Sequence, residues 1–70
     1  MRLGEYLALA GRRLQKAGAD SPRLCAQVLA ENLLGLSRLE CVLATRRELD
    51  SREIAALDAL VDRRAAGEPL

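Results

Sequence analysis

Apolar residues recur along the chain at helical spacing, in four stretches separated by short polar segments. The first stretch places apolar side chains at intervals of four and three residues, at Leu3, Leu7, Ala10, Leu14 and Ala17. Residues spaced in this way lie on one face of an α-helix, so the pattern predicts a helix from Leu3 to Ala17. Gly11 lies inside this stretch and costs a helix about 1 kcal/mol relative to Ala, so two shorter helices are the alternative.

The other three stretches predict three more helices, from Pro22 to Leu34, from Arg38 to Ala44 and from Ser51 to Ala66. Each has an apolar face that we expect to point inward. These faces are Cys25, Val28, Leu29 and Leu33, then Leu39, Val42 and Leu43, and finally Ile54, Leu57, Leu60 and Val61.

Helix start and stop signals stand at the ends of these stretches. Ser21 precedes Pro22, the arrangement of an N-cap followed by proline in the first helical position. Two pairs, Ser37 with Glu40 and Asp50 with Glu53, have the spacing of a capping box. Glycines that suit helix C-termini follow three of the stretches, at Gly18, Gly35 and Gly67.

Together these elements predict an all-α fold, a small helical bundle of four to five helices with short connections. β-Branched residues are sparse and form no alternating run. Short connections favour antiparallel neighbours. Residues 1–66 form the expected bundle domain, and residues 67–70 read as the start of a linker where the chain has been cut.

Composition favours a binding or packing module over an enzyme. The chain has 70 residues, 11 Lys and Arg against 10 Asp and Glu, and no His. It therefore lacks the commonest general base and metal ligand, and we expect no catalytic, cofactor-binding or metal-binding residue. Two cysteines, Cys25 and Cys41, are too few for a disulfide framework and are expected to act as small hydrophobic thiols, with a single disulfide or a thiolate-based site as the alternatives. No signal peptide or membrane span is visible, which favours the cytoplasm.

The charged residues offer two further patterns. Asp58 and Asp62 are four residues apart, so they share a helix face and either hold one cation or are simply solvated. Nearly all positive charge is arginine, including the adjacent pairs Arg12-Arg13, Arg46-Arg47 and Arg63-Arg64. Arginine is favoured at interfaces because it binds carboxylates through two hydrogen bonds, although ordinary surface solvation explains such pairs as well.

A helix-turn-helix between Ala30 and Leu43 is disfavoured. The second helix is too short to fill a major groove, and it offers no Asn or Gln to read base edges. The near-neutral net charge of +1 also argues against strong attraction to phosphates, so no direct nucleic-acid partner is expected.

Three motifs in order make the chain resemble the HemK/PrmC family. The segment from Gly18 to Leu24 (GADSPRL) is similar to that family's GIDSPRL segment, and Leu34 to Arg38 (LGLSR) matches its next helix junction. The last eight residues, RRAAGEPL, are similar to the family's RR-x-x-GEPL motif, which leads into its catalytic domain. The resemblance covers essentially the whole chain.

The resemblance implies the N-terminal helical domain of a methyltransferase that uses S-adenosylmethionine. Enzymes of this family modify the glutamine of the GGQ motif in peptide chain release factors. The cofactor would be held by a C-terminal methyltransferase domain, and this domain would recruit and orient the release factor. On that basis, the candidate contacts to the release factor are Arg12, Arg13, Arg46 and Arg47. The candidate contacts to the catalytic domain or linker are Arg63, Arg64, Glu68 and Pro69.

The chain departs from the family pattern at several positions. Cys25 stands where an acid is frequent, Gln27 replaces a common Glu, and Asn32 replaces a frequent His. Arg2 takes the cap position of the first helix, where the family usually has Thr, and fraying is expected there. The alternative functions are a purely structural domain that packs on the methyltransferase domain, and a small DNA-binding module.

Overall fold

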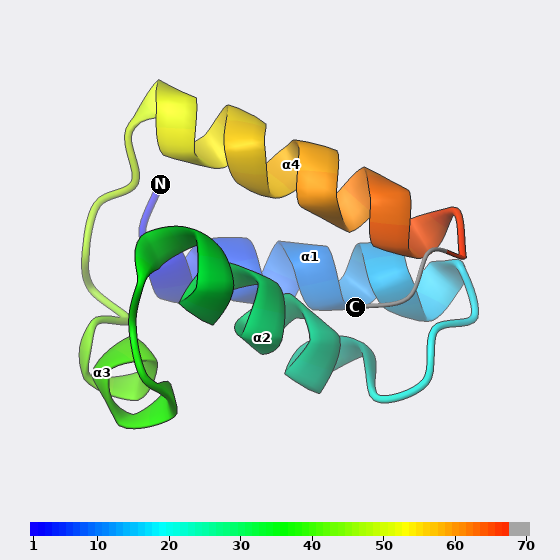
Figure 1. The fold of residues 1–70 in the computed structure, drawn as a ribbon, viewed down its shortest axis with the longest axis horizontal. Helices are drawn as coiled ribbons and strands as arrows, with labels where there is room; N and C mark the ends of the chain where they lie inside the picture. The colour runs from blue at the N-terminus through cyan, green and yellow to red at the C-terminus, as the bar shows by residue number, and fades with distance from the viewer. Residues whose placement is uncertain (68–70) are drawn as a thin grey trace.

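A computed structural model describes residues 1–67 as four α-helices joined by short loops (Figure 1). They are α1 (Leu3–Lys16), α2 (Pro22–Leu34), α3 (Arg38–Leu43) and α4 (Ser51–Ala65). The all-α prediction is confirmed, and each observed bound lies within one residue of the predicted one. α1 is continuous through Gly11, so the two-helix alternative is wrong. The predicted linker lies almost wholly outside the described residues, and its boundary stays a prediction.

α1 is the central helix of the bundle. It packs most extensively against α2 and also contacts α4, and α2 in turn contacts α3 and α4. In Figure 1, α2 runs antiparallel to α1, whereas α4 lies along α1 in the same direction. The loop from α3 to α4 passes the beginning of α1, so chain segments distant in sequence meet there.

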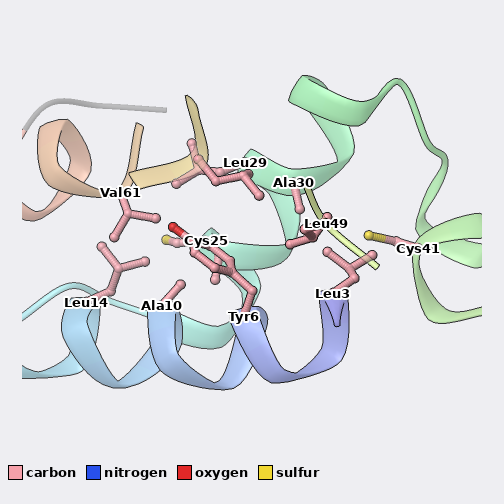
Figure 2. Close-up of a cluster of buried hydrophobic side chains, with 12 residues drawn as sticks. Leu3, Tyr6, Ala10, Leu14, Cys25, Leu29, Ala30, Cys41, Leu49 and Val61 are labelled. Carbon is pink, nitrogen blue, oxygen red and sulfur yellow. The ribbon is translucent and has the colours of Figure 1, made fainter. Parts of the chain in front are cut away.

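The core lies between α1, α2 and α4. Side chains from α1 point toward Cys25 and Leu29 of α2 and Val61 of α4 (Figure 2). At the other end, Leu3, Cys41 and Leu49 close the cluster. The buried apolar residues are Leu3, Tyr6, Ala10, Leu14, Cys25, Ala26, Leu29, Ala30, Cys41, Leu49, Leu57 and Val61. Both cysteines are free thiols within this core, as the sequence predicts.

Two predicted helix faces are rotated relative to the observed ones. In α1, Tyr6 is buried and Ala17 is exposed, so the core stripe is centred closer to Tyr6 than predicted. In α2, Ala26 and Ala30 are buried, whereas Leu33 is exposed and Val28 only half-buried.

The prediction that Leu39, Val42 and Leu43 face inward is wrong. These side chains are 67%, 56% and 75% exposed, and Cys41 is the buried residue of α3. α3 has only six residues, and α2 is the one helix it packs against among the described residues. So short a helix, at the end of the bundle, has one inward position, and its apolar residues on the other sides remain in solvent.

Loop carbonyls hold the beginning of α1. The N–H groups of Leu3 and Gly4 donate to the carbonyls of Arg47 and Thr45 at 2.8 and 2.9 Å, and the Leu49 N–H donates to the Met1 carbonyl at 2.8 Å. Arg2 makes no side-chain cap bond, yet these bonds satisfy N–H groups that a helix leaves unpaired. α1 therefore begins at Leu3 with hydrogen-bonded N–H groups in its first turn, and fraying stays a prediction.

Both predicted capping boxes are present. The N–H groups of Glu40 and Glu53 donate to Ser37 Oγ and Asp50 Oδ1 at 3.1 and 2.8 Å, and both glutamates accept hydrogen bonds in return. The hydrogen bond from the Ser37 backbone lowers the pKa of Glu40, and the bond to the Ser37 side chain adds to this.

Ser21 stands at the N-cap position of α2, but the prediction that its side chain caps the helix is wrong. Its backbone is left-handed, with φ at +49°, and its side chain makes no cap hydrogen bond. A capping side chain requires extended backbone at this position. The sharp turn between α1 and α2 imposes the left-handed conformation instead.

Replacing glycine by alanine is expected to have opposite effects on the stability of the fold at two positions in α1. Gly11→Ala places a methyl group 3.7 Å from the Arg23 Cα, an ordinary contact, and the better helix propensity should stabilise the fold by about 0.5–1 kcal/mol. Gly4→Ala places it 3.2 Å from the Thr45 carbonyl oxygen, which must move, and should destabilise the fold by about 1 kcal/mol. Urea unfolding of both variants measures these effects. Equal shifts of the two midpoints in one direction would contradict the packing of α1 described above.

Candidate partner-binding surface

In two of the adjacent arginine pairs, one arginine forms an ion pair within the domain and the other is exposed to solvent. Arg13 donates to Asp58 Oδ1 at 3.1 Å and to Asp62, which ties α1 to α4. Arg47 donates to Glu53 Oε2 at 2.6 Å. The side chains of their neighbours Arg12 and Arg46 are exposed and have no hydrogen bond or ion pair with residues 1–67. The four candidate contacts therefore do not form one cluster, and their role in partner binding stays a prediction.

Asp58 and Asp62 hold a cation, and it is the guanidinium of Arg13. Tyr6 adds to this site, since its hydroxyl donates to Asp58 Oδ1 at 2.6 Å. Burial, and next the hydrogen bond to Asp58, raises the pKa of Tyr6 well above its ordinary value. The aspartate pair thus belongs to the contact between α1 and α4. Among residues 1–67, no group of three or more ligating side chains is arranged to bind a metal ion.

The last arginine pair lies in the final turn of α4. Its cations suit the negative end of the helix dipole. Arg64 Nε is shielded from solvent without a hydrogen bond to the described residues, while Arg63 is exposed. Glu68 and Pro69 lie outside the described residues, so the proposed contacts of this segment to a linker or second domain stay predictions.

A groove follows the contact between α1 and α2. It consists of two adjoining depressions of about 260 and 310 Å³, which share Leu7 and Arg23. One half is lined by Leu7, Ala8, Gly11, Arg12, Gln15, Pro22 and Arg23. The other half is lined by Gly4, Leu7, Arg23, Gln27, Cys41, Val42 and Thr45. We call these residues the α1–α2 groove.

The α1–α2 groove combines an apolar floor with unpaired positive charge. Arg12 and Arg23 line it, both are exposed, and neither forms an ion pair within residues 1–67. No acidic residue of the described chain lines either half. Two depressions elsewhere on the surface differ in this respect, since one includes Asp58 beside Arg13 and the other includes Glu53 beside Arg47.

Sequence reasoning missed Arg23 as a candidate contact because it considered adjacent arginine pairs. A signal was present, since Arg23 follows Pro22 at the beginning of a predicted helix whose first turn has no acid to pair with it. The positive end of the α2 dipole lies at the same point.

At the other end of the groove, burial raises the pKa of the Cys41 thiol, as does the charge of Glu31. Cys41 is therefore held as a neutral thiol at neutral pH.

The described residues thus define a small all-α domain. No helix within residues 1–67 is long and apolar enough to cross a membrane. The chain belongs to the PrmC N-terminal domain family, whose model matches residues 5–70.

Curated relatives are similar over most of the chain. A release factor glutamine methyltransferase of Rhodospirillum rubrum is 40% identical over 68 residues, which cover 97% of this chain and 21% of the relative. The Corynebacterium glutamicum protein of the same description is 40% identical over 70 residues, covering 100% of this chain and 24% of the relative. That of Caulobacter vibrioides is 40% identical over 58 residues, 83% of this chain and 20% of the relative. The chain thus spans about a quarter or less of these relatives. No solved structure matches it.

Proposed function

We propose that this chain is the non-catalytic N-terminal domain of a cytoplasmic methyltransferase that recruits and orients a peptide chain release factor. The parent enzyme would transfer a methyl group from S-adenosylmethionine to the side-chain nitrogen of the glutamine in the GGQ motif. The cofactor would be bound by a C-terminal domain. The observation that carries this proposal is the match of residues 5–70 to the PrmC N-terminal domain family.

The geometry supports a recruiting role over a chemical one. The described residues hold a groove with exposed cations and apolar side chains, but they offer no histidine and no paired nucleophile and base. Contacts remote from the reacting atoms contribute to catalysis because their binding energy orients the reacting group. A domain that holds the release factor would position the glutamine in this way.

The proposal is tested by titrating the ¹⁵N-labelled chain with unlabelled release factor and following its amide resonances. We expect a contiguous group of amides to shift, with saturation. A second protein of matched size and charge serves as the control and should leave the spectrum unchanged. Unchanged amides with release factor at high concentration would contradict autonomous recruitment.

The second candidate function is structural, with this domain covering part of the methyltransferase domain. The observation that favours it is the exposed apolar surface of α3, formed by Leu39, Val42 and Leu43. Clustered apolar side chains in solvent are typical of surfaces covered in a larger assembly. This function predicts that the parent enzyme keeps normal methylation kinetics when Arg12 and Arg46 of this domain are both replaced by Ala. Arg13 is left unchanged there, because it holds α1 to α4. A large rise in KM for the release factor would favour recruitment.

A further inference from the structure

We propose that the α1–α2 groove binds an acidic, partly apolar segment of the protein substrate, with carboxylates on Arg12 and Arg23 and apolar side chains against Leu7 and Val42. This inference rests on the proposed function, because it names the surface through which recruitment occurs. It commits to one occupant, a protein segment that carries carboxylates beside apolar residues.

Charge complementarity is the first argument for this occupant. The domain pairs Arg13 and Arg47 with its own acids, yet it leaves Arg12 and Arg23 without an ion pair among the described residues. No acidic side chain of residues 1–67 lines the groove to neutralise them. Guanidinium groups bind carboxylates through paired hydrogen bonds, so the ligand that fits these two cations is a carboxylate-bearing segment.

The charged and apolar lining residues lie toward different ends of the groove, which sets the orientation of the bound segment. Arg12 and Pro22 lie in one half of the groove, Arg23 is shared, and Val42, Gly4 and Thr45 lie in the other half. Val42 is 56% exposed and continues into the apolar surface of α3. A bound segment would therefore place acids toward Arg12 and Pro22 and apolar side chains toward Val42.

Leu7 provides the apolar surface of the groove. It is half-buried and lines both halves, whereas Gly4 and Gly11 face the chain's own backbone at Thr45 and Arg23. The volume of each half suits a few side chains and is too small for a folded domain, so an extended or helical segment is the fitting partner.

The experiment compares two double variants of equal charge change. Arg12→Glu with Arg23→Glu reverses the groove cations. Arg38→Glu with Arg52→Glu reverses two exposed cations that line neither half of the groove. We expect the groove variant to bind the release factor at least about tenfold more weakly, because like charges would then face each other. The control variant should stay within about twofold of the wild type, since neither Arg38 nor Arg52 lines the groove and exposed charges outside a contact are screened by salt.

Two probes separate this inference from the proposed function. Release factor that shifts the groove amides of Leu7, Gly11, Gln27 and Val42, and loses affinity for the groove variant, supports both. Release factor that binds the groove variant as tightly as the wild type, with shifts confined to α4, overturns the inference alone.

Where release factor does not bind the wild type, recruitment fails and a synthetic peptide decides the inference. This peptide has about 15 residues, long enough for a marginal helix, with Glu on one half and Leu on the other. Groove shifts with this peptide, and none with its Lys-for-Glu counterpart, support the inference. Equal behaviour of the two peptides overturns it.

Discussion

Replacing Leu57 by Ala is expected to leave much of the protein unfolded. Leu57 is 1% exposed and lies in the core on α4. Truncating a buried leucine costs about 2–5 kcal/mol, because transfer energy is lost and a cavity remains. A core in a domain of this size rarely supplies more than about 3–5 kcal/mol in total. The loss therefore approaches the whole stability of the fold.

The matched control is Leu43→Ala, which makes the same chemical change in α3. Leu43 is 75% exposed, so its truncation should shift stability by about 0.5 kcal/mol or less. Helical circular dichroism followed through urea unfolding measures both variants. A Leu57 variant that unfolds at the wild-type midpoint would mean that α4 does not close the core.

The helices were predictable because their limits depend on neighbours in sequence. Capping boxes join residues three apart, and the glycine that ends α2 adopts its positive φ immediately after the helix. Such signals act within one turn, so a single sequence contains them in full. Ser21 is the exception, since the sharp connection to α1 decides its backbone conformation.

The inward faces were less predictable because they depend on what each helix meets. The apolar residues of α3 have helical spacing, but α3 lies at the end of the bundle and only Cys41 turns inward. Periodicity identifies an apolar face, whereas burial requires a partner of adequate length. Exposure of Leu43 follows from that missing partner, which no spacing rule within α3 encodes.

The sequence indicated that arginines would form the candidate surface, but it did not indicate which arginines lie together and which form ion pairs. The adjacent arginine pairs are visible in the sequence, yet Arg13 and Asp58 are far apart in it and pair only because α1 lies along α4. That pairing removes Arg13 from the set of unpaired cations. Arg23 joins Arg12 in one groove because Gly11 brings α1 and α2 together, which is again a tertiary effect.

The protein is expected to lose stability in alkali through Tyr6. This hydroxyl is buried and donates to Asp58, so its pKa in the folded state is raised. In the unfolded state a tyrosine ionises near pH 10, and that state then binds fewer protons than the folded one. Stability from Tyr6 is thus fully present below about pH 10 and falls by about 1.4 kcal/mol for each further pH unit.

Tyr6 is the sole aromatic residue of the chain, so the absorbance of tyrosinate reports this one group directly. We expect tyrosinate to appear together with the loss of helical circular dichroism rather than before it. Tyr6→Phe is the control. It gives up the hydrogen bond to Asp58, at a cost of about 1 kcal/mol at neutral pH, but removes this ionisation. The thiol of Cys41 contributes a loss of the same sign at lower pH, and it cancels in the difference between wild type and variant. Tyrosinate that forms near pH 10 while the helices remain intact would show that the hydroxyl is not held between α1 and α4.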